Sequence, residues 1–238
     1  MPKQEWPRKK GHSRVAEKTV IATTSASRVL EFIQANLPLA AVPTVPEIRL
    51  HKAGPRSGIW RLAETDADFA SPYWAYDWGG GLALARHILD RPERVAERTV
   101  LDLGAGSGIV GIAAAKSGAK SVIAADIDRY AVIAAGLNAA ANGVTMATLC
   151  ADLTAGLPPA VDIVLVGDLF YEADLAARVT RFLDRCLAAN IEVLVGDPWR
   201  SFLPVPRLAL LAQYPGPDFG AGRRETPRQN AVFAFTAT

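Results

Sequence analysis

The sequence has few of the residues that build disulfide frameworks or metal sites. Its 238 residues include only two cysteines, Cys150 and Cys186, and three histidines. The cysteines lack the spacing of zinc ligands, and two such residues do not make a disulfide scaffold, so a reducing compartment is expected. The histidines are scattered at His12, His51 and His87. We therefore expect no metal site.

Long apolar runs and a strong charge imbalance are also missing. No uninterrupted apolar run approaches the ~18 residues that a membrane span requires. The net charge is only +2, whereas a nucleic-acid-binding face would be strongly basic. Half of the residues are hydrophobic, which is enough for a sizeable core. We therefore expect a cytoplasmic monomer that binds neither membranes nor nucleic acid.

The start of the chain differs in composition from the rest. The stretch MPKQEWPRKKGHSRVAEK is basic and polar, without the apolar segment of a secretory signal. Glu5 and Glu17 argue against a mitochondrial transit peptide. We expect three parts: a disordered basic extension over 1–24, a helix and strand segment that packs on the core over 25–98, and the core itself over 99–238.

From Thr99 onward, apolar strand-like segments alternate with helical ones, which predicts a Rossmann-like α/β fold with seven strands. The expected strands are Thr99–Leu103, Ser121–Ala125, Met146–Cys150, Asp162–Val166, Glu192–Val195, Leu208–Gln213 and Ala231–Phe235. The expected helices are Ser107–Ser117, Arg129–Asn142 and Glu172–Ala189, preceded by a helix at Ser25–Leu37 and a strand at Ile48–His51. The sheet should be mostly parallel with helices on both faces. No helix separates the last two strands, so they should form an antiparallel edge pair.

A glycine-rich loop joins the first of these strands to the first of these helices. In VLDLGAGSGIVG (Val100–Gly111), Gly104, Gly106 and Gly108 allow a tight turn and a close approach of the backbone to a ligand. The same stretch satisfies G-x-G-x-x-G, the dinucleotide fingerprint, with Asp126 near the expected position of a ribose-binding acid. The loop alone therefore permits a nicotinamide dinucleotide.

Four aspartates stand at or just after the ends of successive strands: Asp102, Asp126, Asp152 and Asp168. The carboxyl ends of parallel strands meet at one edge of the sheet, where ligands bind in folds of this type. Asp102 would repel a pyrophosphate but would suit a cation. Asp126 suits a ribose diol, and Asp152 or its neighbours suit an adenine amine. This combination favours S-adenosylmethionine over a dinucleotide.

With these motifs the chain resembles the class I (seven-β-strand) S-adenosylmethionine-dependent methyltransferases. Asp102 to Gly108 is similar to their glycine-rich motif, and Asp126 and Asp152 to their ribose and adenine acids. The resemblance implies that the cofactor is bound by Trp74, Trp78, Asp102, Gly104, Ala105, Gly106, Gly108, Asp126, Ile127, Asp152 and Asp168.

A narrower resemblance comes from the stretch DLFY (Asp168–Tyr171) after the fourth strand. It is similar to the D-x-x-Y motif of protein-lysine methyltransferases, whereas the N-P-P-Y tetrapeptide of other amino methyltransferases is absent. Ser71–Glu93, Val45–Gly58 and Val193–Arg200 resemble the electron transfer flavoprotein β-subunit lysine methyltransferases. This implies lysine N-methylation of that flavoprotein subunit. A ribosomal protein L11 methyltransferase is the alternative, and an NAD-dependent oxidoreductase a more distant one.

The resemblance also implies roles for single side chains. Asp168 would orient the acceptor amine and, secondarily, accept its proton, while Tyr171 would hydrogen-bond the amine or shape its channel. Trp74 and Trp78 would attract a sulfonium through cation–π contacts or pack in the core.

Four further residues carry expectations of their own. Asp197 and Arg200 should contact the acceptor protein from the loop after the fifth strand. Tyr76 is expected to pack in the core, and Asn138 is expected to be an ordinary surface asparagine.

Overall fold

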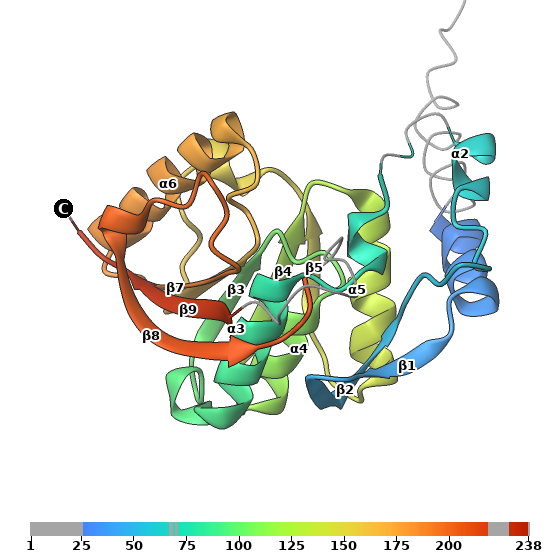
Figure 1. Cartoon of the computed structure of the whole chain (residues 1–238), viewed down its shortest axis with the longest axis horizontal. Coiled ribbons are helices and arrows are strands. Elements are labelled where there is room, and N and C mark those ends of the chain that lie inside the picture. Colours follow the sequence, from blue (N-terminus) through green and yellow to red (C-terminus); the bar gives the residue numbers. More distant parts are fainter. Residues whose placement is uncertain (1–25, 67–68, 70, 219–228, 238) are drawn as a thin grey trace, which may run out of the picture.

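The computed structural model describes residues 26–66, 69, 71–218 and 229–237, so the extension expected at 1–24 lies outside the described residues (Figure 1). A seven-stranded sheet has the order β5-β4-β3-β6-β7-β9-β8. Its strands are β3 (Thr99–Leu103), β4 (Ser121–Asp126), β5 (Ala147–Cys150), β6 (Ile163–Gly167), β7 (Glu192–Asp197), β8 (Leu208–Pro215) and β9 (Gln229–Phe235). The expected strands are all present, with shifts of one or two residues at some ends.

The described helices include the expected ones and two, α2 and α3, that the sequence did not predict. They are a helix over 26–36, α2 (Arg61–Thr65), α3 (Gly79–Asp90), α4 (Ile109–Lys116), α5 (Arg129–Ala141) and α6 (Ala173–Ala188). Four short 3-10 helices connect them: η1 (Tyr73–Ala75), η2 (Pro92–Arg94), η3 (Leu153–Ala155) and η4 (Val205–Arg207). None of the described helices has the length and apolar character needed to cross a membrane.

The strand pairing confirms the predicted fold class. Strands β5, β4, β3, β6 and β7 pair in parallel, and β9 then pairs antiparallel with both β7 and β8. The last strand of the chain is therefore inserted between β7 and the edge strand β8, which makes the antiparallel edge pair that the sequence predicts.

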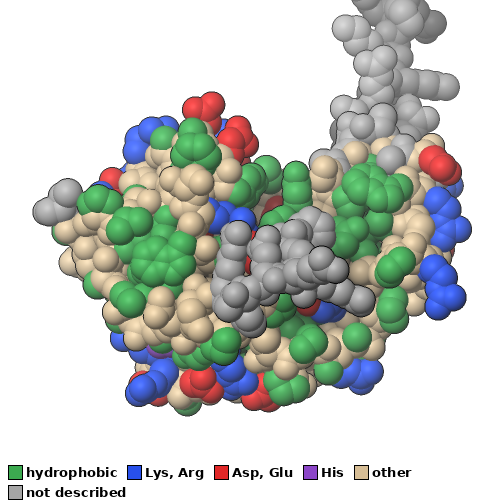
Figure 2. All heavy atoms as spheres, in the orientation of Figure 1, with side chains coloured by type: hydrophobic (Ala, Val, Ile, Leu, Met, Phe, Trp, Pro, Cys, Tyr) green, Lys and Arg blue, Asp and Glu red, His purple; other side chains and the backbone are tan. Residues whose placement is uncertain are grey.

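The central strands β3, β6 and β7 are buried on both faces, since alternate side chains of each strand point to opposite sides of the sheet. In β6, Ile163 and Leu165 join the apolar cluster beneath α3 and α4, whereas Val164 and Val166 join the cluster beneath α6. Helices thus cover both faces, α6 on one and α3 and α4 on the other (Figure 1). On the face shown in Figure 2, hydrophobic side chains gather on both sides of a hollow.

A separate hairpin, β1 (Leu39–Val42) with β2 (Val45–His51), is attached to α5 by two asparagines. Asn142 Oδ1 accepts from Arg49 N at 2.9 Å and Asn138 Oδ1 accepts from His51 N at 2.8 Å. The two asparagines are four helical residues apart, and their two partners are two strand residues apart. Both separations are ~6–7 Å along the axis of the element, so each amide lies opposite one backbone group. These amides satisfy the strand edge that would otherwise be unpaired.

The structure corrects the expectation that Asn138 is a surface residue. Its side chain is fully buried, and its Nδ2 donates to Ser107 O at 2.9 Å. Asn138 therefore ties the hairpin to the glycine-rich loop. Only the topology brings these two segments together, so no local sequence pattern identifies the partners of Asn138.

We expect Asn138→Ala to lower the free energy of unfolding by about 1–3 kcal/mol, because it leaves a buried N–H and a buried C=O unpaired. Asn142→Ala should cost less, about 0.5–1.5 kcal/mol, because water can replace its more exposed bonds. Urea unfolding of both variants measures the difference. Equal losses would contradict the bridging role of Asn138.

Candidate active site

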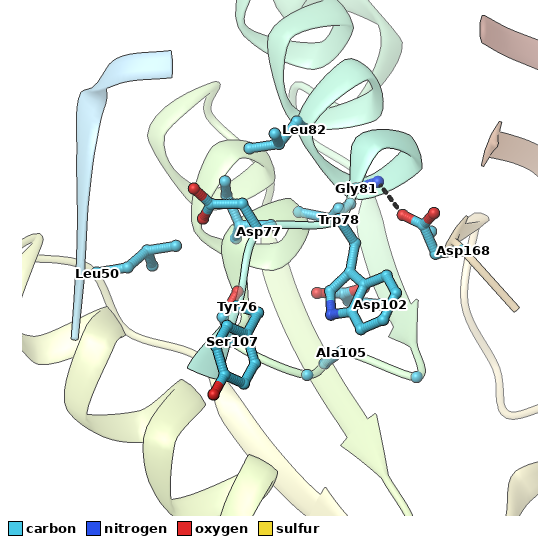
Figure 3. Close-up of a pocket in the computed structure, with 15 residues that line it drawn as sticks. Leu50, Tyr76, Asp77, Trp78, Gly81, Leu82, Asp102, Ala105, Ser107 and Asp168 are labelled. Carbon is cyan, nitrogen blue, oxygen red and sulfur yellow. Dashed lines mark hydrogen bonds between the residues drawn. The ribbon is translucent and has the colours of Figure 1, made fainter. Parts of the chain in front are cut away.

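A pocket opens at the carboxyl edge of the parallel strands, between the glycine-rich loop and the first turn of α3 (Figure 3). It is lined by apolar side chains, glycine backbone and three carboxylates: Leu50, Tyr76, Asp77, Trp78, Gly81, Leu82, Asp102, Gly104, Ala105, Gly106, Ser107, Ile109, Val110, Gly167 and Asp168. Six of the eleven residues expected to bind the cofactor therefore line one cavity.

The glycine-rich loop adopts the turn that its sequence predicts. Gly104, Gly106 and Gly108 have φ angles of +68°, +51° and +79°, a region that favours glycine. A Cβ added to Gly104 would lie 2.6 Å from Leu169, whereas one on Gly106 would meet nothing closer than 3.9 Å. The loop is therefore packed from behind at Gly104 and leaves room for a ligand in front of Gly106.

Asp102 is buried behind this loop and is 1% exposed. Its Oδ2 accepts from Gly111 N in the first turn of α4 at 2.8 Å. Burial raises the pKa of Asp102 to about 7. Asp102 thus anchors the helix that follows the loop, and it also borders the pocket.

Asp126 holds the loop from the neighbouring strand. Its Oδ2 accepts from Gly106 N and its Oδ1 from Asp128 N, both at 2.9 Å. Burial raises its pKa, and these N–H donors oppose the rise. The next residue, Ile127, is 71% exposed. An acid fixed beside Gly106, followed by an exposed apolar side chain, is consistent with the ribose and base contacts that the resemblance implies.

Asp152 lies outside the pocket. Its Oδ1 accepts from the backbone and the hydroxyl of Thr154 at 2.9 and 2.6 Å, and the side-chain bond lowers the pKa of Asp152. It is exposed on the loop after β5, whose Ala151 N donates to Asp126 O at 2.9 Å. The adenine contact of Asp152 stays a prediction, because its observed partners are local.

Asp168 follows β6 with a left-handed φ of +57° and is 8% exposed. Its Oδ2 accepts from Gly81 N at 2.7 Å, and its Oδ1 pairs with Arg200 Nη2 at 2.7 Å. Burial raises the pKa of Asp168, and the Arg200 guanidinium opposes that rise. The carboxylate predicted to be catalytic is therefore also a cap of α3, which the sequence did not show.

Arg200 connects three carboxylates at this edge. Its Nη2 also pairs with Asp218 at 3.1 Å, and Asp218 in turn accepts from Gly79 N at 3.1 Å. The backbone N of Arg200 donates to Asp197 Oδ1 at 2.7 Å. The sequence predicted that Asp197 and Arg200 contact the acceptor protein. In the structure Arg200 pairs with Asp168, and Asp197 bonds to the backbone of Arg200, so their contact with the acceptor protein stays a prediction.

The aromatic residues divide between the core and the rim of the pocket. Trp74 is 2% exposed in the cluster that includes Tyr130, so it packs as a core residue and lies outside the pocket. Trp78 and Tyr76 line the pocket, and Tyr76 also packs against the cluster of Trp74, as expected. The Arg200 guanidinium lies 5.4 Å from the centre of the Trp78 ring. Trp78 thus makes a cation–π contact with Arg200, and its expected contact with a sulfonium stays a prediction.

Tyr171 stands at the rim rather than inside the pocket and is 52% exposed. Its ring centre lies 6.5 Å from that of Tyr73, which in turn is 5.7 Å from Trp78. Partial burial raises the pKa of the Tyr171 phenol. The three rings form a continuous row from the pocket to the surface.

Asp197 gives the site a pH signature, because burial raises its pKa to about 7 from an ordinary value of 3.8. The folded protein then holds a proton that the unfolded chain releases, so stability falls as pH rises from about 4 to about 7. Asp102 contributes in the same direction. We expect Asp197→Asn to flatten this fall, measured by urea unfolding at pH 5 and 8. A slope equal to that of the unmodified protein would contradict the assignment.

The parallel sheet, the glycine turn and the carboxylates at one edge define a class I S-adenosylmethionine-dependent methyltransferase. The model of one family, described as "Ribosomal protein L11 methyltransferase (PrmA)", matches residues 83–170. The Xenopus laevis "Electron transfer flavoprotein beta subunit lysine methyltransferase" is 39% identical over 197 residues, which cover 80% of each chain. The chain belongs to the electron transfer flavoprotein beta subunit lysine methyltransferase family.

A second relative agrees with this assignment, and a solved structure agrees with the fold. The Rattus norvegicus protein of the same description is 39% identical over 157 residues, which span 65% of this chain and 62% of the relative. The solved structure of TrmN from Thermus thermophilus is 23% identical with a TM-score of 0.50, covering 66% of this chain and 49% of its own. The TrmN likeness supports the fold alone. Family membership removes the support for an NAD-dependent oxidoreductase.

Proposed function

We propose that this protein transfers a methyl group from S-adenosylmethionine to a lysine of the electron transfer flavoprotein β subunit. The observation that carries the proposal is the position of Asp168, whose carboxylate lines the same pocket as Gly104 and Gly106. A nucleoside-binding loop and an amine-binding acid are thus within reach of one ligand. The names of the relatives and the D-x-x-Y stretch support lysine of this flavoprotein subunit as the acceptor.

The residues present fit this cofactor. Asp77, Asp102 and Asp168 line one cavity, so a pyrophosphate there would face carboxylates, two of which are paired with Lys52 and Arg200. Gly106 offers open space for a close approach, and Asp126 lies beside it to receive ribose hydroxyls. When bound, S-adenosylmethionine would supply a methyl group on a positively charged sulfur. A neutral amine would take that methyl group, and the sulfur would leave as the neutral thioether of S-adenosylhomocysteine.

The protein's own contribution is to align the amine and, secondarily, to accept its proton at Asp168. A free lysine has a pKa near 10.4, so its ammonium must lose a proton before it can attack. Desolvation in the pocket and nearby positive charge lower that pKa. Asp168 is fixed by Gly81 N and by Arg200, and its remaining lone pairs can accept N–H bonds that orient the amine. Fixed geometry of this kind is the main source of rate in such a displacement.

Ribosomal protein L11 is the second candidate acceptor, because the PrmA model covers the glycine loop and reaches Phe170. The two acceptors are separated by incubating the protein with labelled S-adenosylmethionine and either purified protein. Mass spectrometry of the digested acceptors then locates the label. We expect label on lysine of the flavoprotein β subunit and none on L11. Label on L11 alone would reverse the assignment.

A further inference from the structure

Asp77 lines the pocket outside the glycine-rich loop, and it forms an ion pair with Lys52. Lys52 directly follows β2, and Asp77 follows η1. The two segments are joined by the bond from Ala53 N to Ala75 O at 3.0 Å. Figure 3 shows Asp77 beside Trp78 and Tyr76, on the opposite side of the pocket from Asp168. Asp77 therefore brings the pair to the edge of the pocket, with Lys52 directly beside it.

The bonding of this pair is incomplete among the described residues. Asp77 Oδ2 contacts Lys52 Nζ, whereas Asp77 Oδ1 is buried and has no hydrogen-bond partner in the described part of the chain. The side chains are 23% and 19% exposed for Lys52 and Asp77, so bulk water reaches them poorly. A buried carboxylate oxygen without a donor is costly, and such atoms usually have a partner. The Lys52 ammonium likewise has three N–H donors, one of which donates to Asp77 Oδ2.

We infer that Lys52 and Asp77 bind the amino-acid end of the methyl donor, with Asp77 accepting from its α-ammonium and Lys52 donating to its α-carboxylate. The inference rests on the proposed function. A zwitterion carries a positive and a negative group on one carbon, and an ion pair on the pocket wall presents the complementary charges side by side. Asp126, beside Gly106, remains for the nucleoside end, so the two ends of one ligand meet different acids.

Two alternatives, a dinucleotide ligand and a purely structural ion pair, explain the unpaired oxygen of Asp77 less well. A nicotinamide dinucleotide has no α-ammonium to satisfy Asp77 Oδ1. An ion pair that served only to link β2 to η1 would leave the buried Oδ1 of Asp77 without a hydrogen-bond donor among the described residues. The geometry of Asp77, with one oxygen paired and one free of described partners, is that of a site which a ligand completes.

The test is titration calorimetry with three probes that share the nucleoside. S-Adenosylhomocysteine carries both charged groups, its decarboxylated form keeps only the ammonium, and 5′-methylthioadenosine has neither. Asp77→Asn should weaken the first two by about 10- to 100-fold, the range expected for charge-assisted hydrogen bonds, and methylthioadenosine by less than about twofold. Lys52→Gln should weaken only S-adenosylhomocysteine. Asp90→Asn, which removes a surface partner of Arg86, is the matched control and should change nothing.

A double variant separates ligand binding from a structural link. Lys52→Asp combined with Asp77→Lys restores the ion pair with reversed polarity, so a structural link would be rescued while S-adenosylhomocysteine binding would remain weak. Loss of affinity for all three probes alike, or full affinity in the reversed pair, would overturn the inference. If the unmodified protein bound neither S-adenosylhomocysteine nor methylthioadenosine, the proposed function itself would fall, and the inference with it.

Discussion

Asp168→Asn is expected to reduce kcat for methyl transfer by about 10²- to 10⁴-fold, the range typical of a lost proton acceptor or charge at a reacting centre. Asparagine has nearly the same shape, and its oxygen can still accept from Gly81 N. The variant removes the negative charge that faces the incoming amine, and it leaves Arg200 with Asp218 as its remaining close carboxylate partner. Affinity for S-adenosylhomocysteine should change by less than about tenfold, because Asp168 is assigned to the amine.

The control for Asp168→Asn is Asp184→Asn, which makes the same chemical change in a surface pair with Arg207. Its activity should match that of the unmodified protein. Thermal unfolding of both variants separates a catalytic loss from a folding loss. A folded Asp168→Asn protein with activity within tenfold of the unmodified one would remove Asp168 from the proposed mechanism.

Gly80→Ala is expected to have the largest effect on stability. A Cβ on Gly80 would lie 2.2 Å from Gly196 O and 2.8 Å from Asp168 Oδ2. The obstacle at Gly196 is backbone of a central strand, so α3 would have to move away from β7. We expect the free energy of unfolding to fall by about 3 kcal/mol or more, a large part of the 5–15 kcal/mol typical of a domain. Activity should fall as well, because α3 carries the N–H that holds Asp168.

The comparison for Gly80→Ala is Gly136→Ala in the middle of α5. There the nearest atom to an added Cβ is Thr148 Cγ2 at 3.9 Å. Alanine should raise the free energy of unfolding by about 0.5–1 kcal/mol through helix propensity alone. Urea unfolding measures both effects. Similar values for the two variants would mean that the contact between α3 and β7 is not the constraint described here.

Most of the sheet could be predicted from the sequence, because its strands are short apolar runs bounded by helices with clear ends. The helix α3 could not, since three consecutive glycines (Gly79–Gly81) are unfavourable in a helix interior. They are tolerated because two N–H groups of the first turn bond to Asp218 and Asp168, and because Gly80 must lie against β7. Those partners are more than 80 residues away in the chain, so no local pattern reveals them.

The candidate site was predicted in part for a similar reason. The spacing of strand ends correctly indicated that Asp102 and Asp168 would lie together, because parallel strands bring their carboxyl ends to one edge. The sequence could not show that each carboxylate also bonds to a helix N-terminus. It also gave no sign of Lys52 and Asp77, which belong to connecting segments whose approach depends on the attachment of the hairpin to α5.

The most direct test of the account is a crystal structure of the protein with S-adenosylhomocysteine. We expect the nucleoside to lie along Gly104–Gly106 with its ribose hydroxyls on Asp126, and the sulfur to face the side of the pocket formed by Asp168 and Gly81. A ligand bound away from this carboxyl edge, or a nicotinamide dinucleotide occupying the pocket in its place, would contradict the account.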